Sequence, residues 1–344
     1  MSETHGLTLV HHPPGGQAVL YQAENRYVKS LEGRHGQRFS DYRARWAAAS
    51  LRRDPGPFPL SLDLAINSGC GLSCLMCPLP GNPRDSGYAP MPERLYLRLM
   101  DQAREFSLPA LTLGLASEPL LNPDAPRFAA LAHRAGIMDI RLGTNAQALT
   151  PPMAMALIDS GLTRLEISID AARPETYRSI RRGGELAKVE RAIAFFLSER
   201  DKRNQKFPLL RLSFLTLPQN DGELEPFLER WGPVADLVCV QKPIWFPGTG
   251  LARPARPPAG PARPPIEPDG TAFCAQPWQR LGLDRLGQAW PCCSWYGRDL
   301  LPENAADTPI ADIWRSRALE GLREAHLAGR PPGPCQDCAD SGAF

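Results

Sequence analysis

The sequence predicts an α/β fold in which a parallel sheet is followed by a small cysteine-rich region. Two observations lead to this prediction: six strand-like runs alternate with helix-like stretches, and most of the nine cysteines fall into two groups. Regular alternation of strands and helices requires crossover connections, which produce a parallel sheet. Six strands are fewer than the eight of a closed barrel, so we expect an open barrel or a wound sheet. In either form, ligands bind at the carboxyl ends of the strands.

Local patterns place the elements of this core. Alternation of apolar with small or polar residues marks the first strand, and apolar residues at helical spacing mark the helices. Strands are expected at Leu60–Ile66, Leu111–Leu115, Asp139–Gly143, Arg164–Ile169, Leu209–Leu215 and Asp236–Gln241. Helices are expected at Pro92–Phe106, Ala125–Ala135, Met153–Ser160, Glu185–Glu199 and Glu223–Trp231.

The regions outside the core have weaker signals. Residues 1–57 form an N-terminal extension without sheet periodicity, in which Phe39–Leu51 is expected to form a helix. The core covers residues 58–245. A linker covers residues 246–270, where Pro247–Pro268 holds eight prolines and three arginines. It is either a semi-rigid spacer or a basic contact for a partner or an anionic substrate.

Residues 271–344 form the fourth segment, which is expected to hold a hairpin and a helix. The runs Arg280–Asp284 and Gln288–Pro291 flank a plausible turn, and Pro309–Leu327 has helical spacing. So short a segment has little apolar core of its own. We therefore expect it to depend on a bound metal for its folding.

Composition excludes several classes of function. Hydrophobic residues make up 43% and charged residues 22%, and 39 basic residues balance 37 acidic ones. This balance argues against a dedicated nucleic-acid binder. No apolar run approaches the ~20 residues that cross a bilayer, and no secretory signal is visible. We expect a cytoplasmic protein without a membrane partner, whose cysteines serve metal binding or catalysis rather than disulfides.

The first cysteine group follows the first strand and has the spacing C-x3-C-x2-C. It consists of Cys70, Cys74 and Cys77. Three thiolates cannot fill a tetrahedral zinc site alone. A four-iron cluster usually takes four cysteines, so three leave one iron open to a ligand.

This loop resembles the cluster loop of the radical S-adenosylmethionine superfamily, with Met76 at a position usually held by a bulky residue. The resemblance implies a partial (β/α)6 barrel and a 4Fe–4S cluster that chelates S-adenosylmethionine through its open iron. One electron then cleaves the cofactor, and the 5′-deoxyadenosyl radical abstracts a hydrogen atom from the substrate. It also implies a flavodoxin- or ferredoxin-type electron donor.

Further residues at strand ends support the resemblance. Ala116-Ser117-Glu118-Pro119 resembles the family's Gly-Gly-Glu-Pro motif, which binds the methionine amino group, although small residues replace its glycines. Thr144-Asn145 matches a common family sequence. The resemblance also implies cofactor contacts for three more side chains, with the ribose for the first two and with the methionine carboxylate for the third: Ser168, Asp170 and Arg181.

Each of these residues also has an ordinary structural explanation. Glu118-Pro119 would suit the end of a loop, Asp170 a helix cap, and Arg181 a surface charge. Their order at successive strand ends favours the cofactor interpretation, which covers about residues 58–245.

The second cysteine group brackets the predicted hairpin and helix. It consists of Cys274, Cys292, Cys335 and Cys338, and by themselves two pairs of cysteines indicate structural zinc. After a radical core, the pattern resembles the auxiliary-cluster domains called SPASM and twitch. The resemblance implies one fully ligated 4Fe–4S cluster, for electron transfer, structural support or both. Cys293 is an additional thiol that could replace Cys292 as ligand.

The sequence leaves the reaction open. Relatives of this shape include enzymes that oxidise or epimerise carbohydrate-type small molecules and enzymes that modify peptides or proteins. We favour a small carbohydrate-type substrate and net oxidation. Cys239, on the sixth strand, is either a small buried residue or a hydrogen donor to a substrate radical. An alternative of another class is a zinc-binding scaffold protein.

Overall fold

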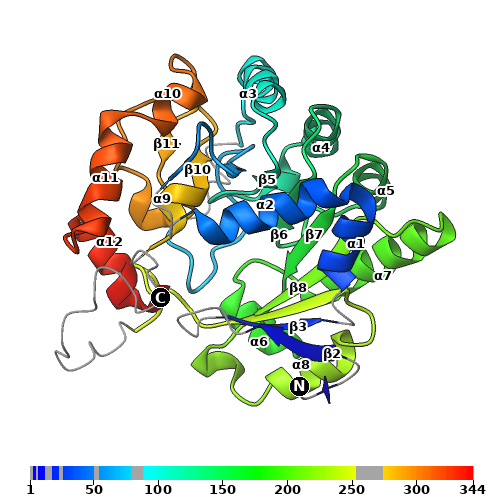
Figure 1. Ribbon diagram of the computed structural model, residues 1–344. Helices are drawn as coiled ribbons and strands as arrows, with labels where there is room; N and C mark the ends of the chain where they lie inside the picture. Colours follow the sequence, from blue (N-terminus) through cyan, green and yellow to red (C-terminus); the bar gives the residue numbers. More distant parts are fainter. Residues whose placement is uncertain are drawn as a thin grey trace.

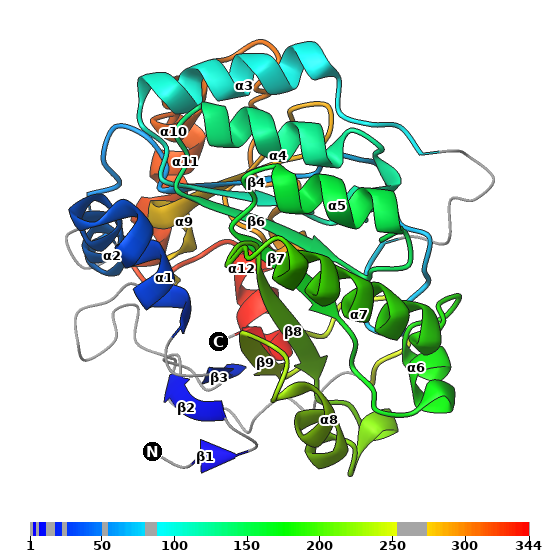
Figure 2. The same ribbon diagram turned by 90° about the vertical axis from the view of Figure 1, so that its right-hand side faces the viewer.

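The computed structural model describes residues 3–4, 7–11, 18–22, 26–49, 54–79, 88–252 and 274–343. Most of the predicted linker lies outside the described residues, so neither interpretation of it is tested. Figure 1 shows a curved sheet with helices around its outer face, and Figure 2 shows those helices stacked side by side. Among the described helices, none has the length and apolar character needed to cross a membrane.

The six predicted strands form the centre of the sheet. They are β4 (Ser61–Leu64), β5 (Ala110–Leu113), β6 (Asp139–Thr144), β7 (Arg164–Ser168), β8 (Leu209–Leu215) and β9 (Leu237–Gln241). Each is parallel to the next in chain order. A doubly wound sheet reverses its order at a switch point. The strictly sequential order therefore confirms an open six-stranded barrel.

Helices at the predicted places follow the strands. They are α3 (Glu93–Glu105), α4 (Ala125–Arg134), α5 (Pro151–Asp159), α7 (Leu186–Lys202) and α8 (Leu224–Trp231). The structure adds α6 (Pro174–Ile180), whose seven residues are too few to show a helical period in the sequence. Single turns occur at η2 (Pro119–Leu121), η3 (Pro218–Asn220), η4 (Trp295–Gly297) and η5 (Ala339–Ala343).

The two faces of the barrel strands differ in chemistry. Aliphatic residues at alternate positions face the helices and belong to the main core, including Leu62, Leu64, Ile140, Leu142, Leu165, Ile167, Leu210 and Leu212. The positions between them line cavities inside the barrel and are mostly polar or charged, including Thr112, Arg141, Glu166, Arg211 and Ser213. The helices therefore cover an apolar face, and the barrel interior remains polar.

The N-terminal extension contains strands, contrary to the prediction. β1 (Glu3–Thr4), β2 (Leu7–His11) and β3 (Ala18–Gln22) pair antiparallel, and β3 pairs antiparallel with β9. These strands cover the edge of the barrel that an open sheet would leave unpaired. Long-range pairing of this kind has little periodic signal, so sequence patterns missed it.

Two helices close the amino end of the barrel, where α1 (Arg26–His35) leads into α2 (Gln37–Ala48). The second corresponds to the helix predicted at Phe39–Leu51, and the first was not predicted. Residues on both helices pack against the first residues of several strands, in a cluster that includes Leu31, Phe39, Tyr42, Leu60, Ala110, Leu209 and Leu237. In Figure 1, α2 lies across the strands.

The C-terminal segment contains the predicted hairpin and a divided helix. β10 (Arg280–Leu283) and β11 (Ala289–Trp290) are antiparallel, as expected. The predicted single helix is α10 (Ile310–Trp314) followed by α11 (Arg317–Leu327). The break lies at Ser316, whose hydroxyl caps α11 by accepting from the Leu319 N–H at 3.3 Å. Short helices α9 (Gln276–Gln279) and α12 (Gly333–Cys338) hold the ends of this segment.

This segment is not a separate small core. β10 pairs parallel with β4 and so extends the barrel sheet. Ile310, Ile313, Trp314 and Leu319 are completely buried within the main core. Much of the apolar support of the segment therefore comes from the barrel, and the dependence of its folding on a bound metal stays a prediction.

Candidate functional site

The first three cysteines line a cavity at the carboxyl ends of the strands. Its volume is about 460 Å³. The sequence-predicted residues that line it with Cys70, Cys74 and Cys77 are Met76, Ser117, Glu118, Thr144, Asn145, Ser168, Asp170 and Arg181. Pro119 does not line the cavity but begins η2. Residues separated by up to more than a hundred positions in the sequence thus meet at one edge of the sheet.

The cysteine loop is held by hydrogen bonds from other elements. Asn145 Nδ2 donates to Cys70 Sγ at 3.4 Å, and the Leu72 N–H donates to the same sulfur at 3.5 Å. Burial raises the pKa of Cys70 to about 12. A thiolate at this position therefore requires a bound cation, as iron would provide.

Glu118 joins two of the strand ends. Its carboxylate accepts from Thr144 Oγ1 at 2.6 Å, from the Asn145 N–H at 2.8 Å and from the Leu120 N–H at 3.0 Å. Burial raises the pKa of Glu118, and these three donors oppose the shift. The side chain lines the cavity, and its three hydrogen bonds also position the loop after β6. Its contact with the methionine amino group stays a prediction.

The approach of β5 to this loop requires glycine at one position. Gly114 has φ +125°, and a Cβ there would lie 2.8 Å from the Gly143 carbonyl oxygen. Two residues later, Ala116 has φ +44°, where the family motif has glycine. Alanine tolerates this conformation at a cost, so the small residue preserves the close approach.

Asp170 and Arg181 form a buried ion pair beside the cysteine loop. Asp170 Oδ2 pairs with Arg181 Nη2, and Asp170 Oδ1 accepts from the Leu215 N–H at 2.8 Å. Arg181 Nη1 lies 3.8 Å from Cys74 Sγ. The alternative explanations for both residues are wrong. Asp170 does not cap α6, because the N–H groups of Ala172 and Arg173 just before that helix donate to Glu223. Arg181 is largely buried rather than on the surface.

Two polar atoms in this cavity fit a bound ligand. Ser117 Oγ and Arg181 Nε are buried and have no hydrogen-bond partner within the described residues. Both side chains line the cavity. Buried polar atoms are normally hydrogen-bonded. A cofactor with amino, carboxylate and hydroxyl groups would supply partners, so the residues fit S-adenosylmethionine.

The second cysteine group lines a smaller cavity of about 200 Å³. Cys274, Cys292, Cys335 and Cys338 meet there as predicted, and Cys293 also reaches it while being exposed. Gly297 gives room to one sulfur, since a Cβ at Gly297 would lie 2.7 Å from Cys292 Sγ. Burial raises the pKa of Cys335 to about 12, so these thiolates too require a cation.

The cysteines of neither group surround the position of a single metal ion. Across the part of the chain that the structure describes, no three His, Cys, Asp or Glu side chains are arranged to hold one metal ion. Zinc draws its thiolates to about 2.3 Å from one centre. A cluster of several irons is larger and holds its ligands further apart.

Family models match both regions. The model of the radical SAM superfamily matches residues 64–229, and that of the SPASM iron–sulfur cluster-binding domain matches residues 274–339. The chain is a radical SAM enzyme with a C-terminal SPASM domain. Its cofactors are a SAM-binding 4Fe–4S cluster, one auxiliary 4Fe–4S cluster and S-adenosylmethionine. The zinc-scaffold alternative is therefore wrong.

The sequence identity between this chain and individual relatives is low. The probable GTP 3',8-cyclase of Methanococcus vannielii is 31% identical over 139 residues, which cover 40% of this chain and 46% of the relative. That of Methanothermobacter marburgensis is 26% identical over 306 residues, covering 78% and 92%. The chain thus spans less than half the length of the first curated relatives. Streptococcus suis SuiB bound to S-adenosylmethionine has a similar fold, with TM-score 0.62, 16% identity and coverage of 93% and 83%.

Sequence reasoning missed the charged residues inside the radical SAM barrel. Arg141, Arg164, Glu166 and Arg211 lie on the inner faces of β6, β7 and β8. A signal was present, since charges occupy alternate positions of strands whose other face is aliphatic. In the structure the helices cover the aliphatic face, so the charges face the barrel interior.

Proposed function

We propose that this radical SAM enzyme abstracts hydrogen from a small, carbohydrate-type substrate and oxidises it. When bound, the cluster and S-adenosylmethionine supply the radical that removes the substrate hydrogen. The observation that carries the proposal is the chemistry of the cavity below the cysteine loop. There Thr112, Ser213 and Gln241 offer hydrogen bonds, and Arg141 and Glu166 offer charges. Such a lining suits a molecule rich in hydroxyl groups.

The cavity supports a division into two levels. Ser117, Asn145, Asp170 and Arg181 lie at or beyond the strand ends, close to the three cysteines. Arg141 lies three residues before Thr144 on β6, which is about 10 Å deeper along the strand. We assign S-adenosylmethionine to the upper level and the substrate to the lower one.

Two observations support oxidation over epimerisation. The four predicted auxiliary ligands meet in one cavity, where a cluster would accept an electron from the substrate radical. Cys239 is buried on β9 and is not among the residues that line the substrate cavity. Its thiol lies against Arg211 instead. Gln241, two residues later, does line the cavity.

The proposal also includes a cellular compartment and an electron donor. None of the nine cysteines forms a disulfide, which suits a reducing compartment. We infer that the enzyme works in the cytoplasm and receives electrons from a flavodoxin- or ferredoxin-type donor.

A deuterium-transfer experiment tests the proposal before the substrate has been identified. Cells grown in deuterated medium supply an extract that is separated into small metabolites and peptides. Each fraction is incubated with reconstituted enzyme, a reductant and unlabelled S-adenosylmethionine, and the mass of 5′-deoxyadenosine is measured. We expect deuterium from the small-metabolite fraction. Transfer from the peptide fraction alone would replace the proposal with peptide modification, and a variant without the first three cysteines controls for background.

A further inference from the structure

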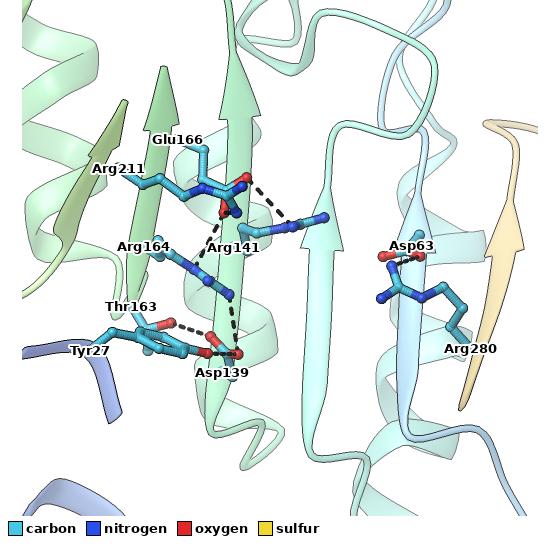
Figure 3. Close-up of polar contacts among 9 residues, drawn as sticks. All are labelled: Tyr27, Asp63, Asp139, Arg141, Thr163, Arg164, Glu166, Arg211 and Arg280. Atoms are coloured by element: carbon cyan, nitrogen blue, oxygen red, sulfur yellow. Dashed lines mark hydrogen bonds and ion pairs between the residues drawn. The ribbon is translucent and has the colours of Figure 1, made fainter. Parts of the chain in front are cut away.

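The floor of the proposed substrate level is a layer of charged side chains inside the barrel. Figure 3 shows Arg141, Arg164 and Arg211 gathered around Glu166, with the pair of Arg280 and Asp63 apart from them. Arg211 Nη1 lies 2.7 Å from Glu166 Oε1, Arg164 Nε lies 3.5 Å from the same oxygen, and Arg141 Nη1 lies 3.5 Å from Glu166 Oε2. One carboxylate thus faces three guanidinium groups.

Other carboxylates compensate only part of this positive charge. Arg164 Nη2 also reaches Asp139 Oδ2 at 3.3 Å. Arg280 pairs with Asp63 at 3.0 Å, on the other side of the barrel. The layer drawn in Figure 3 therefore holds four arginines against three carboxylates. Burial opposes ionisation of Glu166, but Arg141, Arg211 and Arg164 hold its pKa at about 2, so this carboxylate stays charged.

Arg141 is the member of this layer that makes no hydrogen bond within the described residues, where its contact is the one at 3.5 Å with Glu166. Its Nε is buried without a partner, as are the Nε atoms of Arg164, Arg211 and Arg280. Its side chain is 27% exposed, against 13% for Arg164 and Arg211. Arg141 also lines both the cysteine cavity and a second cavity of about 200 Å³ nearer α2. Its guanidinium is accessible from the substrate level.

We propose that Arg141 binds a carboxylate of the substrate. The planar guanidinium fork of Arg141 matches the two oxygens of a carboxylate. Binding would give Arg141 the hydrogen bonds it lacks. The inference rests on the proposed function, because it places the substrate in this cavity, and it narrows the substrate class to acidic molecules such as uronic or amino acids.

The test begins with the deuterated small metabolites. Anion exchange separates neutral from acidic molecules, and phosphatase treatment of the acidic part removes phosphate esters. We expect deuterium transfer from the acidic part, surviving the phosphatase. Transfer only from neutral metabolites, or its loss after phosphatase treatment, would overturn the carboxylate assignment.

Variants of the complete, reconstituted enzyme then test Arg141 itself. Arg141→Gln removes the charge, and we expect the concentration needed for half-maximal transfer to rise at least about tenfold. Arg141→Lys keeps the charge and should recover part of that loss. Arg178→Gln, the same exchange at an exposed position on α6, should behave like wild type. Iron content reports whether each variant folds. Equal half-maximal concentrations in wild type and Arg141→Gln would overturn the assignment.

A binding measurement separates this inference from the proposed function. The enzyme loaded with S-adenosylmethionine is titrated calorimetrically with glucuronate, glucose 6-phosphate and glucose. We expect glucuronate to bind more tightly than the other two, and we expect Arg141→Gln to abolish this difference in affinity. If no metabolite donates deuterium but this preference persists, the proposed function fails and the anion site stands. Equal binding of glucuronate and glucose would overturn the site.

Discussion

The two cysteine-lined cavities of this molecule differ in the charge and aromatic content of their walls. Around Cys70, Cys74 and Cys77 the walls are polar and charged, with an ion pair and a glutamate among them. Around the C-terminal cysteines the walls include Phe246, Trp295 and Tyr296. A cluster that must hold a polar cofactor needs partners beyond its thiolates, whereas a fully ligated cluster needs shielding. The side chains around the cysteines therefore tell more about chemistry than the cysteine spacing does.

The largest effect is expected when the three cysteines of the first cavity are removed. Changing Cys70, Cys74 and Cys77 together to Ala should abolish cleavage of S-adenosylmethionine and remove about half of the iron. The reason is that no other described side chains replace these ligands at the strand ends. Iron assay and chromatography of 5′-deoxyadenosine measure both effects. Full iron content in this variant would mean that the cluster is held elsewhere.

Removing cysteines of the second cavity should affect fewer activities. Cys335→Ala with Cys338→Ala should also remove about half of the iron, while cleavage of S-adenosylmethionine persists and product formation is lost. Because β10 pairs with β4 and Trp314 is buried in the barrel core, the segment should stay folded.

Limited proteolysis checks the structural half of this prediction. New cleavage should be confined to the region of α12, beyond the end of α11 at Leu327. Digestion of the hairpin or of α10 would show that the cluster supports the whole segment, as its short sequence first indicated.

A third experiment tests the role of the buried ion pair in the first cavity. Arg181→Gln leaves Asp170 buried without its cation, and breaking a buried pair in this way is strongly destabilising. We expect the thermal unfolding midpoint to fall by about 5 °C. We also expect the Michaelis constant for S-adenosylmethionine to rise about tenfold, from the lost charge-assisted hydrogen bond. The exposed Arg178→Gln should change neither, and equal losses in both variants would show that the ion pair contributes nothing.

The sequence predicted what depends on local pattern. Alternation located all six barrel strands, and the order of the strand ends brought Ser117, Asn145 and Asp170 to one cavity. It could not tell that β3 would pair with β9 or that β10 would pair with β4, because such pairing depends on which edges remain open. It located Ser316 inside a helix, since a single polar residue does not interrupt a helical period.

The charged residues inside the barrel show a different limit of prediction from sequence. The pattern Arg164-Leu-Glu166-Ile-Ser168 indicates a strand, but alternation alone does not say which face meets the helices. Only the packing of Leu165 and Ile167 against the helices makes the other face interior. Arg141 and Glu166 therefore became candidate substrate contacts only once the sheet was in view.

The smallest effect is expected for Cys239→Ala. Cys239 lies on the inner face of β9 opposite Ser213, but it is almost completely buried and contacts Arg211 rather than the substrate level. Loss of one buried sulfur should cost about 1 kcal/mol of stability. With the true substrate in deuterated water, the variant should still form the oxidised product, and neither enzyme should place solvent deuterium on carbon. Because a thiol exchanges its hydrogen with water, a donor would reveal itself by that label. Deuterium on carbon in wild type that disappears in Cys239→Ala would make the enzyme an epimerase, and the auxiliary cavity would then lose its assigned role as electron acceptor.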